Sequence, residues 1–284
     1  ISQSDGAIFA AQLANNVTVT MSGTVPQPRD GDLDAGIITH EFGHGISNRL
    51  TGGPATTSCL NNSEQGGEGW SDYLGLMLTT NWVVATLNDG PNLRPVGTYV
   101  LGQPTNGGGI RNYPYTTNIT ANPLTYQHMG LGAVPPWLFS NGSEVHNIGE
   151  IWCAALWEMT WGIIQQQGTI NQNIYDFTPA TPGGNSIALK LVMEGMKLQP
   201  CSPGFLDARN AILTADKNLY GGSHQCAIWT AFAKRGMGYS AIQGSSSSTT
   251  DQTAAFDLPP APNITGQPSD VTVAVGGTAN FTVT

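Results

Sequence analysis

Charged side chains are scarce in this sequence, and cations are the scarcer kind. Asp, Glu, Lys and Arg make up 10% of the 284 residues, with 10 Lys and Arg against 19 Asp and Glu and a formal net charge of −9. An ordinary soluble domain carries roughly 25% charged residues. A nucleic-acid-binding protein needs a basic face that neutralises phosphates, so we expect no nucleic-acid partner.

Long apolar runs are absent as well. No stretch reaches the 18 or so apolar residues that a membrane-spanning helix requires, so we expect no transmembrane segment. The chain is nevertheless 39% hydrophobic with seven Trp, which is too apolar for a disordered protein. It opens on Ile1 without a secretion signal; the expectation is a removed leader or a piece of a longer chain.

Cysteine is used sparingly, with four residues and no Cys-x-x-Cys pair. An even count in an acidic chain rich in Ser, Thr, Asn and Gly favours an oxidising, extracellular setting. Four cysteines allow three pairings. Because Cys201 and Cys226 flank one expected helix, we predict a disulfide between them; four buried thiols are the alternative.

Hydrophobic periodicity predicts a mostly helical chain after one short N-terminal strand at residues 17–21. Acidic residues at the start and glycines at the end are typical helix boundaries. The helices are expected at residues 37–50, from about 68, from about 148, and near 185–198, 204–219 and 224–235. Between them, residues 87–145 are rich in Gly, Pro and Asn and predict a long functional loop.

The character of the chain changes near its end. A Pro-rich linker is expected at residues 258–262, and residues 271–275 and 281–284 alternate as β-strands do. Twenty-two residues cannot form a sheet domain alone. We therefore predict that residues 263–284 are the truncated beginning of an all-β, Ig-like module, which follows a main domain over residues 1–257.

The segment His40-Glu-Phe-Gly-His44 carries the strongest chemical signal. Helical residues four apart lie on one face, so the two imidazoles can point neutral nitrogens at one zinc ion. Glu41 then lies where it can take a proton from a water on the metal. With only five His in the chain, chance is a poor explanation; an amphipathic helix with two paired histidines is the structural alternative.

A catalytic zinc needs a third protein ligand and one open position. Leu50 occupies the place of a third histidine six residues after His44, so a carboxylate on the next helix is the other solution, from Glu64 or Glu68. We favour Glu68, because Asp72 lies one turn further along the same side and can accept the N–H of a zinc-bound histidine. The alternative for Glu68 is an ordinary acid at a helix N-terminus.

At this point the sequence resembles the fungalysin family of secreted zinc metalloendopeptidases, within the thermolysin-like group whose third zinc ligand is a Glu. The resemblance covers roughly residues 26–240. It rests on the segments at residues 40–53, 67–72, 109–115, 145–152, 207–212 and 226–236.

The resemblance implies one catalytic Zn²⁺ bound by His40, His44 and Glu68, with Glu41 as the general base. It also implies that His146 donates a hydrogen bond to the oxyanion of the tetrahedral intermediate. An exposed residue at a helix start is the alternative for His146.

Weaker matches concern the substrate. Asn16 resembles part of the edge strand that binds the substrate backbone in thermolysin-like enzymes, although an ordinary strand entry explains it as well. Cys59 stands where those enzymes carry a Tyr that assists the oxyanion, so this helper is either absent or replaced by Tyr113 or Tyr115. Arg111 either pairs with a substrate carbonyl or carboxylate or forms a structural ion pair.

Asp30, Asp32 and Asp34 resemble the start of a calcium loop, but its twelfth position would be Glu41. We interpret these aspartates as helix caps, and a Ca²⁺ site elsewhere stays open as an expectation.

The predicted fold class is α+β: a thermolysin-like zinc peptidase with a mainly helical C-terminal subdomain and a short N-terminal β segment. Residues 1–257 would be its catalytic domain, incomplete at the N-terminus. The predicted function is a secreted endopeptidase that hydrolyses extracellular proteins or peptides. A removable N-terminal propeptide and cell-surface association through C-terminal β modules are further expectations.

Two rival functions remain. An aminopeptidase of this zinc class would carry a Gly-x-Met-Glu-Asn segment, which is absent. A catalytically silent surface or adhesion protein could retain the zinc helix pair as a scaffold. The intact Glu41 argues against the silent protein, because a scaffold has no need of the base.

Overall fold

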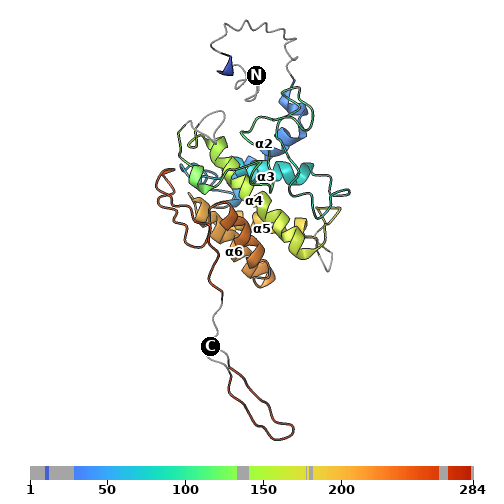
Figure 1. Ribbon diagram of the computed structural model, residues 1–284, viewed down its shortest axis with the longest axis vertical. Coiled ribbons are helices and arrows are strands. Elements are labelled where there is room, and N and C mark those ends of the chain that lie inside the picture. Colours follow the sequence, from blue (N-terminus) through green and yellow to red (C-terminus); the bar gives the residue numbers. More distant parts are fainter. Residues whose placement is uncertain are drawn as a thin grey trace.

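The computed structural model describes residues 10–12, 29–132, 141–176, 178, 182–261 and 268–282 (Figure 1). Six α-helices and two short 3-10 helices form this part of the chain. They are η2 (Gly31–Leu33), α2 (Ala35–Leu50), α3 (Gly67–Thr79), η3 (Tyr126–His128), α4 (Val145–Gln167), α5 (Gly184–Leu198), α6 (Phe205–Tyr220) and α7 (Gln225–Lys234). The six α-helices begin close to the predicted starts, and α2, α5, α6 and α7 also end close to the predicted ends.

Helix α4 forms the centre of the molecule. It packs against α3, α5 and α7, while α2 lies on α3 and α6 lies on α5. Trp152 of α4 contacts Trp70 of α3 edge-on at 4.9 Å between ring centroids, and it also packs on Phe205 and Phe232. Each such buried aromatic contributes about 2–3 kcal/mol through its apolar surface. Among the described residues no helix, α4 included, combines the length and apolar character that a membrane span requires.

Local sequence sets the ends of the helices. Asp34 caps α2, because its carboxylate accepts the N–H of Gly36 at 2.9 Å. Glu144 caps α4 in the same way, accepting the N–H of His146 at 3.0 Å. The helix α4 ends at Gly168, whose φ of 69° lies in the left-handed region that favours glycine.

The long segment between α3 and α4 contains no α-helix among its described residues and is held by side chains from elsewhere. The fully buried guanidinium of Arg235 donates hydrogen bonds to the carbonyl oxygens of Asn122, Leu124 and Thr116, at 2.8, 3.0 and 2.8 Å. These contacts satisfy backbone groups that no regular element satisfies. The position of this segment therefore depends on a few specific anchors.

One disulfide joins Cys59 to Cys201, so the predicted pairing of Cys201 with Cys226 is wrong. Cys226 is an exposed free thiol and Cys153 a buried one. The physical reason is the length of α6, whose 16 residues span about 24 Å between the two predicted partners. A disulfide requires Cα atoms within about 7 Å of each other.

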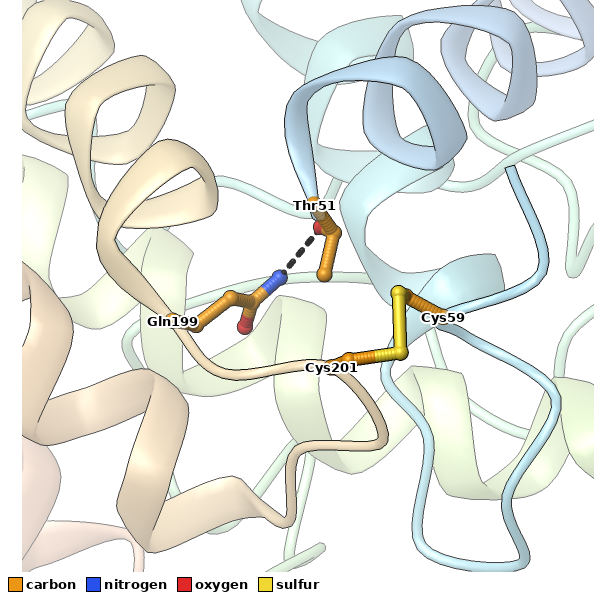
Figure 2. Close-up of a disulfide and its surroundings, with 4 residues drawn as sticks. All are labelled: Thr51, Cys59, Gln199 and Cys201. Atoms are coloured by element: carbon orange, nitrogen blue, oxygen red, sulfur yellow. Dashed lines mark hydrogen bonds between the residues drawn. A yellow bond between two sulfur atoms is a disulfide. The ribbon is translucent and has the colours of Figure 1, made fainter. Parts of the chain in front are cut away.

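The bridge ties the segment after α2 to the segment after α5. Figure 2 shows it beside a hydrogen bond in which the Gln199 amide donates to the Thr51 hydroxyl at 2.7 Å. Thr51 follows the last residue of α2, and Gln199 follows the last residue of α5. The C-terminal ends of these two helices are thus held together both covalently and by a buried polar contact.

The α+β fold class is corrected by the structure. The described residues are helical and contain no strand, only isolated bridges such as the one between Arg94 and Tyr115. Residues 17–21, where the N-terminal strand is predicted, lie outside the described residues.

The prediction of an Ig-like beginning at residues 263–284 is also wrong. Its described residues, 268–282, contain one turn, with the Gly277 N–H donating to the Ala274 carbonyl at 2.9 Å, and no strand. Val273 and Val275 are exposed, and Figure 1 shows the segment apart from the helices. Alternation creates one apolar face, but a strand pair with no second layer over that face has little to stabilise it.

Candidate metal centre

Helices α2 and α3 bring the motif histidines and Glu68 together. The Nε2 atom of His40 lies 3.0 Å from Oε2 of Glu68, and Nε2 of His44 lies 3.5 Å from the same oxygen. One ligand atom from each of the three side chains lies within 4.8 Å of the other two. In the part of the chain that the structure describes, this is the one group of three such side chains arranged to hold a metal ion.

The donor set fits a cation. Oε2 of Glu68 is buried and makes no hydrogen bond, although it faces two imidazoles. A buried carboxylate oxygen without a partner is costly, and a metal ion among these three side chains would remove that cost. Two imidazole nitrogens and one carboxylate are the protein ligands of one class of catalytic zinc site.

A buried carboxylate orients the first histidine. Oδ1 of Asp72 lies 2.7 Å from Nδ1 of His40, which leaves Nε2 directed at Glu68. The Asp72 side chain is in turn held by Arg111, which donates from Nε to Oδ2 at 2.7 Å and from a terminal nitrogen to Oδ1 at 2.8 Å. The Tyr115 hydroxyl also donates to Oδ2 of Asp72.

The charges around the site shift the protonation of its members. Burial alone would raise the pKa of Asp72, but the hydrogen bonds and charge of Arg111 outweigh it and hold that pKa well below its usual range. Burial would likewise raise the pKa of Glu68, and the facing imidazoles of His40 and His44 lower it instead. Both carboxylates are therefore ionised at neutral pH, as a metal site requires.

The third imidazole comes from the first turn of α4. Nε2 of His146 lies 3.5 Å from Oε2 of Glu68. Its Nδ1 lies 2.7 Å from Oε1 of Glu144, the residue that also caps the helix. With Nδ1 directed at a carboxylate, Nε2 is turned toward the cluster, and the half-exposed ring faces solvent as well.

Close helix crossings fix the distances between these groups. A β-carbon on Gly149 of α4 would lie 2.5 Å from Cβ of Glu68, and one on Gly69 would lie 2.5 Å from the Gly149 carbonyl oxygen. A β-carbon on Gly43, which lies between the two motif histidines, would lie 2.8 Å from Cα of Ser71. Only glycine fits where backbones approach this closely.

Two of the three aspartates before α2, Asp30 and Asp34, act as caps, as the sequence predicts. Oδ1 of Asp30 accepts the N–H of Asp32 at 3.0 Å, and Asp34 caps α2. No metal-binding group that includes them is found among the described residues. The structure thus offers no support for Ca²⁺ at these side chains.

The residues predicted to bind substrate are placed elsewhere. Tyr115 is fully buried and Arg111 is 7% exposed, with its guanidinium on Asp72, so the ion pair and not the substrate contact is what the structure contains. Both side chains bind Asp72: for Arg111 this is the structural ion pair that the sequence left open, and for Tyr115 it replaces the predicted place at the substrate. Asn16 lies outside the described residues. Glu41 follows His40 on α2 and is exposed.

Sequence reasoning missed several residues around the site. Glu144, Gly149 and Glu150 all lie near the start of α4, and Asn112 lies beside Arg111. The carboxylate two residues before His146 was readable as a cap signal. The roles of Asn112 and Glu150 depend on the path of an aperiodic segment, for which the sequence carries no signal.

A helix carrying H-E-x-x-H beside a Glu on the next helix is the arrangement of ligands in one class of zinc-dependent hydrolases. A model of the family described as fungalysin metallopeptidase (M36) matches residues 15–241. The chain belongs to this family, as its motifs predict.

Curated relatives agree with this assignment. Extracellular metalloproteinase mep of Aspergillus fumigatus is 43% identical over 215 residues, which cover 74% of this chain and 31% of the relative. Extracellular metalloproteinase MEP of Fusarium vanettenii is 42% identical over 235 residues, which cover 81% and 34%. Extracellular metalloproteinase 4 of Arthroderma otae is 44% identical over 221 residues, which cover 75% and 31%. The chain thus spans about a third of the length of these relatives.

Proposed function

We propose that the protein containing this chain is a secreted, zinc-dependent endopeptidase that cleaves extracellular proteins or peptides. The observation that carries the proposal is that the imidazoles of His40 and His44 face Oε2 of Glu68, a buried carboxylate oxygen that makes no hydrogen bond. Membership in a metallopeptidase family supports the reaction class. The names of the relatives support an extracellular location.

In this proposal His40, His44 and Glu68 hold the zinc ion, and Asp72 fixes the ring of His40. When bound, zinc supplies Lewis-acid polarisation of the scissile carbonyl and lowers the pKa of water toward 7. Glu41 accepts a proton from the attacking water and delivers it to the leaving amine.

His146 donates a hydrogen bond from Nε2 to the oxyanion that forms on the carbonyl carbon. The contact between its Nδ1 and Glu144 supports this role, because it fixes the ring with Nε2 directed toward the candidate metal ligands. A donor placed where negative charge develops typically contributes 10²–10³ in turnover.

The proposal includes the removable N-terminal propeptide that the family resemblance implies. Association with the cell surface loses its basis, since the predicted C-terminal β module is not found in the described residues. The silent surface protein remains the second candidate from the sequence, and the ordered contacts of His146 and Asp72 give no reason to prefer it.

The full-length protein tests the proposal by cleavage of casein. Activity should disappear with a zinc chelator and return with zinc, and Glu41→Gln should lower turnover at least about a hundredfold while zinc still binds. Glu194→Gln is a matched control, because Glu194 pairs only with Lys197 on α5 in the described contacts. Zinc-loaded wild type without activity on any unfolded substrate would contradict the proposal.

A further inference from the structure

Helix α4 carries a buried carboxylate that the proposed chemistry does not use. Glu150 lies one turn after His146 and is 1% exposed. Its Oε1 accepts two hydrogen bonds from Asn112, from the backbone N–H at 2.8 Å and from the side-chain amide at 2.9 Å. Its Oε2 is buried without a hydrogen-bond partner. Among the described residues it forms no ion pair with a Lys or Arg.

A buried carboxylate such as Glu150 destabilises the folded protein. Burying a carboxylate without a cation is unfavourable unless the group is neutral and hydrogen-bonded. Burial raises the pKa of Glu150 to about 7, although the hydrogen bonds from Asn112 oppose the shift. An apolar residue would fill this place in α4 at lower cost, so the contact with Asn112 is the property that distinguishes a carboxyl group here.

Asn112 is the residue that follows Arg111. It belongs to the segment between α3 and α4, which has no α-helix of its own among the described residues and depends on side-chain anchors. The guanidinium of Arg111 makes two hydrogen bonds to Asp72, and Asp72 contacts His40 at 2.7 Å. An anchor on the Asn112 backbone therefore fixes the point from which Arg111 reaches Asp72.

Helix α4 carries both His146, which lies near Glu68, and Glu150, which binds Asn112. Residues four apart lie above one another on a helix, so Glu150 stands directly beyond His146. The Asn112 amide also donates to Oδ1 of Asn147 on that face, at 2.7 Å. The helix α4 thus places His146 near Glu68 and, through Glu150, places Arg111 behind Asp72.

We propose that Glu150 is a positioning residue: it holds Asn112 and Arg111 in place, so that Asp72 directs the ring of His40 toward the metal. This inference rests on the proposed function, since it assigns a role within the same zinc site. Glu150 touches no metal ligand and acts through Asn112, Arg111 and Asp72 in turn.

The test is the zinc affinity of the full-length protein, measured by competition with a chromophoric chelator. E150A should weaken zinc binding about tenfold, the lower end of the effect of residues that orient metal ligands. E150Q keeps the Oε1 acceptor for Asn112 and should restore the affinity to within about threefold. E158A is the matched control, because Glu158 is the other carboxylate of α4 and pairs with Lys234 and Arg235 instead.

Coupling to Arg111 provides a second measurement. If Glu150 acts through Arg111, then E150A should weaken zinc binding little further in a protein that already carries R111Q, because neighbours in one network are not additive. Fully additive losses would overturn the proposed route. Should E150A fail to fold, N112A removes the side-chain contact and keeps the backbone N–H on Oε1 of Glu150, so it should weaken zinc binding by about threefold, less than E150A does.

The outcomes separate the two proposals. Wild type that binds zinc, with folded E150A or N112A binding it equally well, would overturn the role of Glu150 alone. Wild type that binds no zinc would overturn the proposed function and this inference together. A merely structural residue would lower the melting temperature and leave the zinc affinity of the folded protein unchanged.

Discussion

Gly149 on α4 lies directly against Glu68 on α3, so that a β-carbon on the glycine would come within 2.5 Å of Cβ of the proposed third ligand. Helices α3 and α4 cross at the candidate metal site. Glu68 can occupy its position because Gly149, which faces it, has no side chain. Gly69 makes the same crossing from the other side, under the Gly149 carbonyl.

Gly149→Ala should therefore displace Glu68 and weaken zinc binding by about tenfold or more, in the range found for residues that support metal ligands. Gly162→Ala on the same helix is the control, because its added carbon would meet Ala227 only at 3.6–3.7 Å, an ordinary contact. The measurement is zinc affinity of both folded variants. Equal affinity in the two would show that the crossing does not position Glu68.

His146→Ala should lower turnover by about 10²–10³ and leave zinc affinity within about threefold of wild type. The reason is that His146 faces Glu68 at 3.5 Å from the exposed side and is not needed in the three-ligand set. Glu68→Gln should instead weaken zinc binding, and its loss of turnover should follow from the loss of zinc. Peptidase kinetics and zinc titration on the two variants distinguish the roles, and loss of zinc by His146→Ala would contradict this assignment.

The candidate metal ligands could be predicted because the number of residues between them places their side chains on one face of a helix. His40 and His44 share a helix face at i and i+4, and Glu68 with Asp72 repeats that spacing at the start of the next helix. The helices themselves followed from periodicity and from end signals such as the glycines after Leu50. These signals are local, and the structure retains them.

The missed features are long-range. Cys59 and Cys201 are 142 residues apart, and no pattern relates them. The contact between Asn112 and Glu150 depends on an aperiodic segment whose course is set by tertiary anchors. The prediction of strands near the C-terminus failed for a related reason. Alternating apolar and polar residues give a strand one apolar face, but the strand is stable only when that face packs against another part of the protein.

Peptide mapping under non-reducing conditions should yield a peptide that links Cys59 to Cys201. Replacing both cysteines by Ala should lower the free energy of unfolding by about 2–5 kcal/mol, the usual cost of a lost native disulfide. Cys226→Ala should change it little, because that thiol is exposed and unpaired. A linked peptide that contains Cys226 would contradict the structure.

Glu64 should make stability fall as pH rises. It is fully buried, accepts hydrogen bonds from the Tyr126 hydroxyl and the Phe205 N–H, and leaves Oε2 without a partner. Burial raises its pKa from 4.5 to about 7, and the nearby Asp207 and Asp251 add to the shift.

The native state therefore binds this proton more tightly than the unfolded state does. Its contribution to stability is complete below pH 4.5 and is lost as pH rises through 7, by at most about 3 kcal/mol. Glu64→Gln should flatten the decline between pH 5 and 8 in denaturant titrations. Part of the slope should remain, because the pKa of Glu150 is raised in the same way. An unchanged slope in Glu64→Gln would show that Glu64 is ionised in the native protein.

The bridge between Cys59 and Cys201 also closes a covalent ring around most of the site. Glu68, Asp72, Arg111 and His146 all lie between the two cysteines, in a loop of 142 residues. A single cleavage of the chain inside this ring leaves both pieces attached to each other. If the protein cleaves peptide bonds as proposed, an autolytic cut within the ring leaves the candidate zinc ligands on covalently joined pieces, whereas a cut outside the ring releases a fragment.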